Sequence, residues 1–505
     1  MNIATLLERV AQRAPASLAI VDEATGAGYT YRAFVDRIFR AGARLRQLAA
    51  DESGARIAIL GDAGLDYLCA DYGAMCSGLV RVPLDPHLSL DEAAGQLNDA
   101  GARVLLYDGK HADMALRLQA LVTIPALTLA ALESLDDPSL SHDVRYGPPG
   151  EIASLNYTGG STGRPKAVVH THGSLSAALQ NIVMARPNGA GTVFLNVRPL
   201  WPIAAIVLLA QFVAGGTVVL GTFSPEHFWQ QIATFGVHLT SLVPTQLVRI
   251  LRAAPETPLA LPTLRSIDVG AAAIPIEVLE QAATVFGPVV AMLYGLTEAP
   301  WCCYRSPEET ALVKHDKPET HGYVGRPLFG VEVQLRGPSG SLPVNEIGEV
   351  YVRGRNVMRG YWNQPDLTSD VLVDAWFRTG DLGRMDADGR LFLAGRAKTI
   401  IRTGGKSVQP DEVETLLMQH PAVTEAAVVG VPDIEWGEIV VAAIAVHPGT
   451  PDDVVADVMR HCRDGLSSYK RPKEIRVVDA LPRSHYGKVQ GSKVRDLFLG
   501  PVAAT

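Results

Sequence analysis

Long apolar runs and cysteines are both scarce in this sequence of 505 residues, and each shortage excludes a class of protein. The longest apolar stretch, residues 203–213, contains Gln211 and is shorter than the ~18–20 residues that cross a membrane. It predicts a buried helix. The five cysteines are odd in number and lack metal-ligand spacing. They favour a reducing compartment, the cytoplasm, and adjacent Cys302 and Cys303 are expected to be packing residues.

Basic residues are too few and too scattered for a nucleic-acid-binding protein. The chain has 45 lysines and arginines against 53 aspartates and glutamates, a net charge of −8, and no basic block. Nucleic acid is therefore not expected as the main partner. The first residues contain no basic region followed by an apolar stretch, so the sequence predicts no secretion signal.

What the sequence does contain is a repeated alternation of strand and helix patterns. An apolar strand pattern at residues 56–60 is followed by a helical pattern and a second strand pattern at 79–84. A capping box at 89–92 and a Ser-Pro-Glu run at 224–226 predict helix starts. Further strands are predicted at residues 104–107, 217–220, 239–243, 267–269 and 289–293. This repetition predicts a parallel sheet covered by helices.

The pattern of apolar and turn-forming residues changes after about residue 320. Short alternating segments at 331–335 and 349–352 predict a small antiparallel β-region. From about residue 397 the patterns predict a compact α+β unit. We therefore predict an α/β fold with a large N-terminal domain, residues 1–396, made of two β/α subdomains and the small β-region. A small mobile α+β C-terminal domain would follow at residues 397–505.

The segment from Asn156 to Lys166 has a composition that suits phosphate binding. It contains three glycines, several hydroxyl side chains and a lysine. Glycines let backbone N–H groups approach an anion closely, and the hydroxyls and the lysine add donors and charge. The segment is not a Walker loop, because no Gly-Lys-[Ser/Thr] ends it. It predicts a loop that binds a polyphosphate.

Four later segments also carry polar groups where loops are expected. The run Tyr-Gly-Leu-Thr-Glu at 294–298 follows a predicted strand, at the edge where open α/β sheets bind ligands. The run at 376–381 places an aspartate in a turn, and the run at 395–398 lies at the predicted domain junction. The run at 482–488 isolates a lysine beside glycine. His170 and His172 are predicted to be a strand residue and a helix start, not a metal pair.

These five motifs occur in this order over essentially the whole length of the chain. They resemble those of the adenylate-forming superfamily of acyl-CoA synthetases, peptide-synthetase adenylation domains and beetle luciferases. Within that superfamily they are most similar to the motifs of the CoA ligases. The resemblance implies a two-step reaction. A carboxylate attacks the α-phosphate of ATP, giving an acyl-adenylate and pyrophosphate, and a thiol or amine then displaces AMP. It also implies that the small domain rotates between the steps.

The resemblance assigns nucleotide-binding roles to matching residues. The phosphate-binding loop would hold the β- and γ-phosphates of ATP through Thr158, Ser161, Thr162, Gly163 and Lys166. Adenine would lie between one wall that begins at Tyr294 and Gly295 and another wall formed by Gly270, Ala271 and Ala272.

Thr297 would contact the α-phosphate, and Glu298 would hold Mg2+, a hard cation that prefers carboxylate oxygen. Asp381 would accept hydrogen bonds from the ribose hydroxyls, with Arg396 in support. Taken singly, Glu298 could also cap a helix and Asp381 could belong to an ordinary turn. Their positions in the order of the five motifs favour the nucleotide-binding roles over these alternatives.

Two lysines complete the assignment. Lys398 matches the hinge between the domains. Lys488 would reach the α-phosphate and the carboxylate during adenylation only and then move away. The predicted catalytic residues are Lys166, Thr297, Glu298 and Lys488.

The acid pocket is expected to be apolar and partly bulky. It would be lined by Trp201, Pro202, Val243, Ala273, Gly295, Ala299 and Trp301. The family usually has a gating histidine and then a glycine after a Pro-Leu-aromatic run, and this chain has Pro202 and Ala205 at those places. Proline cannot rotate as a gate or donate a hydrogen bond. We predict a compact hydrophobic or aromatic carboxylic acid as the substrate.

CoA is the predicted acceptor, because residues 469–472 and 402–406 resemble the CoA-ligase versions of those segments. Other options stay open: a separate carrier protein, an amine that gives an amide, or activation of an inorganic acid, nitrite, for diazotisation of an aryl amine. A catalytically silent nucleotide-binding protein is the remote alternative. The expected cofactors are ATP, Mg2+ and CoA, the setting is secondary metabolism, and a homodimer is among the options.

Overall fold

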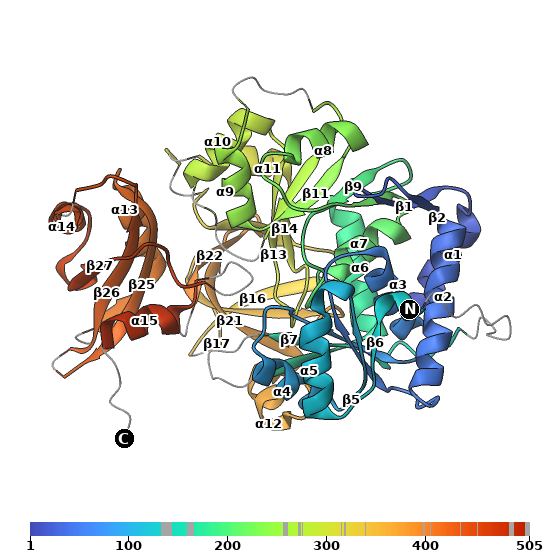
Figure 1. Ribbon diagram of the computed structural model, residues 1–505. Helices are drawn as coiled ribbons and strands as arrows, with labels where there is room; N and C mark the ends of the chain where they lie inside the picture. The colour runs from blue at the N-terminus through green and yellow to red at the C-terminus, as the bar shows by residue number, and fades with distance from the viewer. Residues whose placement is uncertain are drawn as a thin grey trace. The chain divides into compact units, whose positions relative to one another are not determined.

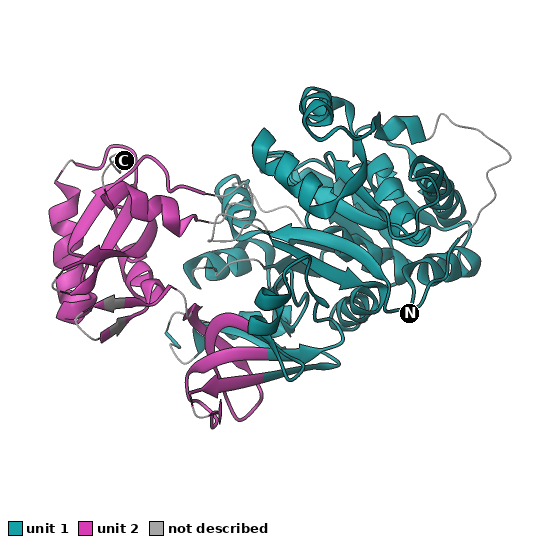
Figure 2. Ribbon diagram, turned by 90° about the horizontal axis from the view of Figure 1, so that it is seen from below, with its two compact units in different colours: residues 1–333, 352–378 teal, residues 334–351, 379–505 magenta. Residues whose placement is uncertain are grey.

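The computed structural model describes residues 1–132, 144–158, 166–255, 261–270, 274, 276–314, 316–317, 320–338, 340–396, 399–403, 406–434, 436–451, 453–483 and 489–499. The chain forms two compact units, residues 1–333 with 352–378, and residues 334–351 with 379–505 (Figure 2). The division passes through β16 (Val331–Gly337), β18 (Gly348–Gly354) and β21 (Trp376–Met385). A domain boundary after Arg396 stays a prediction.

One sheet of the first unit has the strand order β19-β8-β7-β4-β3-β5-β6. Its strands are β3 (Arg56–Leu60), β4 (Val80–Leu84), β5 (Ala102–Tyr107), β6 (Ala126–Thr128), β7 (Ile152–Thr158), β8 (Lys166–Thr171) and β19 (Gly360–Tyr361). β3, β4 and β5 pair in parallel, whereas β7, β8 and β19 pair antiparallel. The parallel strands are apolar and buried along nearly their whole length, as expected for strands covered on both faces.

The other sheet of the first unit runs from β15 through β14-β13-β12-β11-β9-β10-β1 to β2. Its strands are β1 (Leu18–Asp22), β2 (Gly28–Thr30), β9 (Val193–Asn196), β10 (Thr217–Leu220), β11 (Leu239–Leu242), β12 (Ser266–Val269), β13 (Val290–Tyr294), β14 (Cys303–Arg305) and β15 (Tyr323–Pro327). The central strands pair in parallel. The predicted parallel β/α organisation is therefore confirmed.

Helices cover these sheets (Figure 1). They include α1 (Ile3–Arg13), α2 (Tyr31–Leu48), α3 (Leu65–Cys76), α4 (Leu90–Ala100), α5 (Ala112–Val122), α6 (His172–Ala185), α7 (Ala205–Val213), α8 (Phe228–Phe235), α9 (Pro244–Arg252), α10 (Ile276–Phe286), α11 (Pro307–Ala311) and α12 (Pro365–Val371). Three of them, α2, α3 and α7, meet at Phe34, Tyr72 and Phe212, whose ring centroids lie 4.9 to 6.5 Å apart. The stretch expected to be a buried helix is α7.

Of the two helix starts predicted from local sequence patterns, one is confirmed and one is misplaced. Ser89 and Glu92 form the predicted capping box of α4, with hydrogen bonds in both directions. The helix start predicted at 224–226 is misplaced by a few residues, because residues 225–227 form a turn and α8 begins at Phe228. Ser224 Oγ accepts from the His227 backbone N–H at 3.4 Å, and the Ser224 carbonyl accepts from the Phe228 N–H at 3.0 Å. Ser224 therefore caps the turn that precedes the helix.

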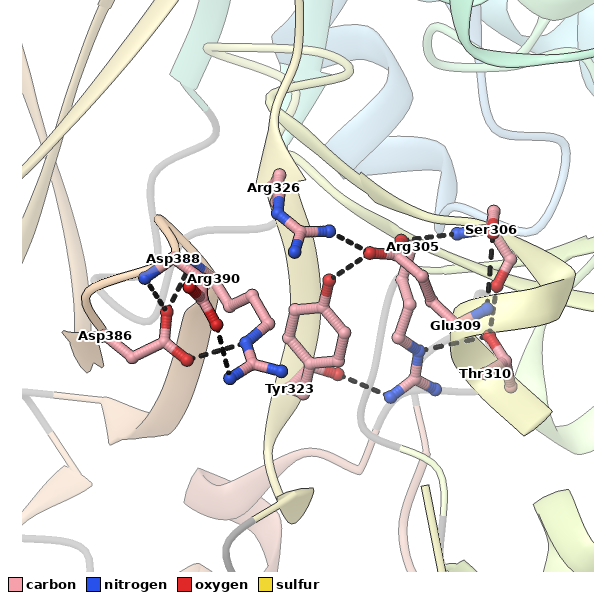
Figure 3. A network of polar contacts seen from close by, with 9 residues as sticks. All are labelled: Arg305, Ser306, Glu309, Thr310, Tyr323, Arg326, Asp386, Asp388 and Arg390. Carbon is pink, nitrogen blue, oxygen red and sulfur yellow. Dashed lines mark hydrogen bonds and ion pairs between the residues drawn. The ribbon is translucent and has the colours of Figure 1, made fainter. Parts of the chain in front are cut away.

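A polar network ties α11 to the adjacent strands β14 and β15 (Figure 3). Glu309 accepts hydrogen bonds from the Tyr323 hydroxyl at 2.9 Å and from Arg326. The buried Arg305 guanidinium donates to the Thr310 hydroxyl and to the Tyr323 carbonyl, at 3.1 and 2.7 Å. In the second unit, Arg390 pairs with Asp386 and Asp388 in the turn after β21.

The second unit contains parts of β16, β18 and β21 and the elements that follow them. A small antiparallel region includes β16, β17 (Gly340–Ser341), β18, β21 and β22 (Leu391–Arg396). An α+β part holds β23 (Ile401–Thr403), β24 (Lys406–Val408), β25 (Val423–Asp433), β26 (Gly437–Val446) and β27 (Glu474–Val477), with helices α13 (Pro410–Met418), α14 (Val454–Gly465) and α15 (Gly491–Leu499). Both parts match the predicted element types.

Two expectations about the whole chain can be compared with the structure. In the part of the chain that is described, no helix is long and apolar enough to cross a membrane. All five cysteines are free and buried, including Cys302 and Cys303, which are packing residues as expected.

Candidate active site

The predicted phosphate-binding loop connects β7 to β8. β7 ends at Thr158 and β8 begins at Lys166, and these two residues are register partners across the hairpin. Ser161, Thr162 and Gly163 lie outside the described residues. The hairpin therefore presents Thr158 and Lys166 opposite one another at the two ends of the loop.

Glu298 and Lys166 are brought to one place by Tyr361, which the sequence analysis did not single out. Tyr361 lies on β19, beside β8, and its hydroxyl donates to Glu298 Oε1 at 2.9 Å. Lys166 Nζ lies 5.7 Å from the centroid of the Tyr361 ring. Burial raises the pKa of the Tyr361 phenol far above its ordinary value, and the Glu298 carboxylate raises it further. The phenol therefore stays protonated and acts as a donor to the carboxylate.

The predicted run at 294–298 is a tight turn at the end of β13. Leu296 and Ala299 bond each other's backbone in both directions, at 3.1 and 3.2 Å. A Cβ atom on Gly295 would lie 2.7 Å from the Trp301 backbone nitrogen, so a side chain cannot fit there. The turn thus holds Thr297 and Glu298 at the carboxyl end of a parallel strand, as predicted.

His170 supports this turn from β8. Its Nε2 lies 2.7 Å from the Thr297 carbonyl oxygen, and its Nδ1 lies 2.9 Å from the Ser174 hydroxyl. Burial lowers the pKa of His170 to about 4. The imidazole is therefore neutral at pH 7, with its proton on Nε2, because a carbonyl can only accept. His170 is a strand residue and His172 begins α6, as predicted.

The predicted adenine walls lie at neighbouring strand ends. Gly270 directly follows β12, which pairs in parallel with β13, and Tyr294 is the last residue of β13. A Cβ atom on Gly270 would lie 3.2 Å from the Leu293 carbonyl oxygen, so the two segments approach closely. Ala271 and Ala272 lie outside the described residues.

The Trp301 wall of the predicted acid pocket is backed by a buried ion pair. The Arg186 guanidinium lies 5.3 Å from the Trp301 ring centroid and donates to Asp268 at 2.9 Å. Tyr304 stacks on Trp301 at 5.9 Å and donates its hydroxyl to Asp268 at 3.1 Å. Asn181 donates to the Trp301 carbonyl at 3.1 Å. Both charged side chains are essentially inaccessible, so this wall is rigidly supported.

The remaining predicted pocket residues have different environments. Trp201 is buried, and its ring lies 5.9 Å from that of His87. Ala299 is fully buried, whereas Pro202 and Val243 are half-buried, and Val243 precedes the first residue of α9. Ala273 lies outside the described residues.

Asp381 and Arg396 meet in the second unit. They are register partners on β21 and β22, and Arg396 Nε lies 2.9 Å from Asp381 Oδ1. The Thr379 hydroxyl accepts from the Asp381 backbone N–H and donates to the Val350 carbonyl, at 3.0 and 2.9 Å. The Thr-Gly-Asp run therefore fixes a mostly buried carboxylate beside a cation. Lys398 and Lys488 lie outside the described residues.

The described residues contain no group of three or more His, Cys, Asp or Glu side chains arranged to hold an ion. Glu298 offers a single oriented carboxylate. Such an arrangement fits Mg2+, which is commonly bound by one or two carboxylates together with substrate phosphates and water.

Parallel sheets with polar turns at their strand ends, together with an α+β region, are typical of α/β proteins that bind a ligand at that edge of the sheet. The family description AMP-binding enzyme matches residues 7–362, and the description of its C-terminal domain matches residues 412–488. The chain belongs to the AMP-binding enzyme family and is an AMP-forming ligase.

Three similar proteins show how far the likeness extends. A feruloyl-CoA synthase from Amycolatopsis sp is 34% identical over 480 residues, or 94% of each chain. The crystal structure of ATP-bound MatB from Rhodopseudomonas palustris has a TM-score of 0.89 at 27% identity and covers 99% of both chains. The amide bond synthetase McbA from Marinactinospora thermotolerans has a TM-score of 0.87 at 29% identity, covering 98% of this chain and 99% of that one.

Proposed function

We propose that this protein activates a compact hydrophobic or aromatic carboxylic acid with ATP and transfers the acyl group to the thiol of CoA. In the first step a carboxylate oxygen bonds to the α-phosphorus of ATP while the bond from that phosphorus to pyrophosphate breaks. In the second step the thiol sulfur bonds to the acyl carbon, AMP leaves, and the thiol proton is released. Catalysis of phosphoryl attack is mainly positioning and charge stabilisation.

We assign the β- and γ-phosphates to the β7–β8 hairpin, where Lys166 would supply charge and Thr158, Ser161, Thr162 and Gly163 would supply donors. Glu298 would hold Mg2+, which would neutralise phosphate charge. The Tyr361 hydroxyl at 2.9 Å orients the Glu298 carboxylate, and such outer-shell partners commonly fix metal ligands. Thr297 would contact the α-phosphate.

The nucleoside would be held by a further set of residues. Adenine would lie against Tyr294, with Gly270, Ala271 and Ala272 opposite. Asp381, fixed by Thr379 and Arg396, would accept from the ribose hydroxyls. The carboxylate is already oriented by the ion pair at 2.9 Å, which limits the entropy lost on binding.

Lys488 would stabilise the charge on the α-phosphate and the acid during adenylation, and Lys398 would be the hinge about which residues 397–505 turn between the two steps. The five buried free cysteines support a reducing compartment, the cytoplasm, for this reaction.

The acid is assigned from the walls of the predicted pocket. Trp201 and Trp301 are large, buried and apolar, and Gly295 keeps the intervening turn narrow. Pockets built from such side chains select mainly by shape and size. The similar feruloyl-CoA synthase acts, by its name, on an aromatic acid. These observations support an aryl or similarly compact acid.

The observation that carries the CoA assignment is that lysines lie beside aromatic rings at two places in the second unit. Tyr469 has Lys406 Nζ at 4.5 Å and Lys470 Nζ at 5.8 Å from its ring centroid. Lys473 Nζ lies 5.4 Å from the ring of Trp436, which is 40% exposed. Exposed rings can stack on a base, and lysines attract phosphate charge. This chemistry suits the phosphorylated adenosine part of CoA.

Amide formation is the second candidate, because the amide bond synthetase McbA resembles this chain over nearly its full length. An amine acceptor would need no phosphate-binding lysines. Substitution of Lys406 by alanine therefore separates the two functions. It should raise the KM for CoA about tenfold if CoA is bound there, and it should leave an amine acceptor unaffected.

The test is a screen of pyrophosphate release with aryl, fatty, amino and inorganic acids, followed by mass spectrometry of products with CoA and with amines. Aryl-dependent pyrophosphate release and an aryl-CoA thioester are expected. Release only with a long fatty acid or nitrite would overturn the acid assignment, and an amide formed in preference to a thioester would overturn the CoA assignment.

A further inference from the structure

A buried arginine, Arg81, lies between the acid-pocket wall and the strand that leads into the phosphate-binding loop. Arg81 is on β4, and only 2% of its side chain is exposed. Its Nη1 lies 2.6 Å from Oδ1 of Asp71 on α3, a carboxylate that is fully buried. Because an unpaired buried charge is strongly destabilising, Asp71 is what allows a guanidinium to occupy this interior position.

The rest of the guanidinium connects two separate segments. Its Nε donates to the Ser154 hydroxyl at 3.0 Å, and its Nη2 donates to both Asn156 Oδ1 and the Pro202 carbonyl, each at 3.0 Å. Ser154 also donates to Asn156 at 2.9 Å. Asn156 is two residues before Thr158, where the phosphate-binding loop begins. The Nη2 atom of Arg81 thus donates both to β7, at the end that leads into that loop, and to the acid-pocket wall.

The acid-pocket wall around Pro202 is also held from either side. The Tyr72 hydroxyl, next to Asp71 on α3, donates to the Ala205 carbonyl at 2.8 Å. The Trp201 ring lies 5.9 Å from His87, in the turn that follows β4. The segment from Trp201 to Ala205 is therefore fixed by α3, β4 and the turn after β4. The Pro202 carbonyl is the contact that leads on to β7.

We propose that Arg81 is a positioning residue that couples nucleotide binding to the shape of the acid pocket. A guanidinium is planar and its N–H directions are fixed, so a shift of Asn156 tilts the donor that holds Pro202. Nucleotide bound at the loop would restrain Asn156, and through Arg81 it would restrain the Pro202 wall. Acid and nucleotide would then strengthen each other's binding by the same factor. The inference rests on the proposed placement of the acid beside Trp201 and Pro202.

Hydrogen–deuterium exchange of the full chain tests this without knowledge of the acid. The amides of Ala205, Ile206 and Val207 are hydrogen-bonded within the wall segment and report its opening. In the wild-type protein, saturating α,β-methylene-ATP with Mg2+ should slow their exchange about tenfold. In Arg81→Lys, which keeps a charge but lacks the planar fork, nucleotide should bind and leave their exchange unchanged.

Two further variants separate positioning from general destabilisation. Arg186→Lys alters another buried arginine–aspartate pair, one that backs Trp301, and it should keep the wild-type response to nucleotide. The double variant Asp71→Leu/Arg81→Met replaces the whole pair by apolar side chains, an exchange that proteins often tolerate. In this double variant, nucleotide should leave the exchange of the three amides unchanged, as in Arg81→Lys. The double variant therefore still tests the proposal if Arg81→Lys folds poorly.

Calorimetry with ferulate as the acid probe measures the coupling factor itself. Wild-type protein should bind ferulate at least about fivefold more tightly with α,β-methylene-ATP than without it, and the Arg81 variants should show no such difference. If wild type does not bind ferulate, the aryl-acid assignment fails while the exchange experiment still decides the role of Arg81. Equal slowing of exchange in wild type and both Arg81 variants, or no slowing in wild type, would overturn the inference.

Discussion

Tyr361 illustrates how one neutral hydroxyl can orient a carboxylate, here that of Glu298, which we propose to hold Mg2+. It donates to Glu298 at 2.9 Å, and its own backbone N–H is held by the Thr368 hydroxyl at 2.9 Å. Because its raised pKa keeps the phenol protonated, the bond persists across the whole physiological pH range. The carboxylate is thereby oriented before any cation arrives, and removing that orientation should weaken Mg2+ binding more than it weakens the fold.

We predict that Tyr361→Phe lowers the affinity for Mg2+ about tenfold, the size of effect usual for an outer-shell partner. The measurement is the Mg2+ concentration at half-maximal nucleotide binding, followed by fluorescence of a labelled ATP analogue. Tyr323→Phe is the matched control, since Tyr323 donates to Glu309 at the same 2.9 Å away from the predicted nucleotide contacts. Equal effects of the two variants would contradict the assignment of Glu298.

His170 gives a residue-level prediction for pH. Its folded pKa is about 4, below the ordinary value of 6.5, so between these values the unfolded chain binds more protons. The free energy of unfolding should therefore fall as pH decreases from about 6.5 to 4. His170→Asn should make this dependence shallower by up to about 1.4 kcal/mol per pH unit, measured by denaturant unfolding from pH 4.5 to 6. An unchanged slope would contradict a buried neutral imidazole.

At the scale of single elements, helix α13 carries Glu414, a carboxylic acid whose ionised form is disfavoured by burial. Glu414 accepts a hydrogen bond from the Val428 backbone N–H on β25 at 2.8 Å. Burial raises the pKa of Glu414 to about 7, and the nearby Asp411 adds to the rise. In the folded protein this carboxyl is thus half protonated near neutral pH, although in the unfolded chain it is ionised.

Glu414→Gln should stabilise the second unit above pH 7, because the amide oxygen can still accept from Val428 and no charge is buried. The stability contributed by protonated Glu414 is fully present below about pH 4.5 and is lost as pH rises through 7. The gain at pH 8 should be about 1–2 kcal/mol, measured by thermal or denaturant unfolding at pH 8 and pH 4.5. A gain of the same size at both pH values would mean that charge is not its cause.

Most elements follow from local pattern, and the exceptions have local causes. The strands β3, β4 and β10 lie where their apolar runs predicted them, because a strand buried on both faces needs such a run. The start of α8 was misplaced by a few residues, because Ser224 caps the turn of residues 225–227 that precedes the helix. Tyr361 was overlooked because a two-residue strand has no periodicity to reveal it.

At the scale of the whole molecule, residues with different proposed roles belong to different units. Lys166, Thr297 and Glu298 belong to the first unit, and Asp381 and Arg396 to the second. Lys488, in the second unit by sequence, is proposed to act only in adenylation. A reaction in two steps, with different groups in each, can be separated by experiment.

We predict that Lys488→Ala lowers the rate of adenylate formation by at least about 100-fold, within the usual range for loss of a charge-stabilising group. Reaction of a supplied aryl-adenylate with CoA should change little. Single-turnover kinetics of each half-reaction provide the measurement. Parallel loss in both steps would instead point to a role in folding or in a shared contact.

The element types, the order of the motifs and the family can be read from the amino-acid sequence, because burial patterns and short polar runs are local properties of the chain. Which polar groups contact one another depends on the folded arrangement of distant segments. Tyr361 reaches Glu298 across 63 residues, and Arg81 joins Asn156 and Pro202, at 75 and 121 residues' distance in sequence. These contacts depend on the pairing of β19 with β8 and of β4 with β7. Strand register is fixed by packing across the whole sheet, and no single segment encodes it.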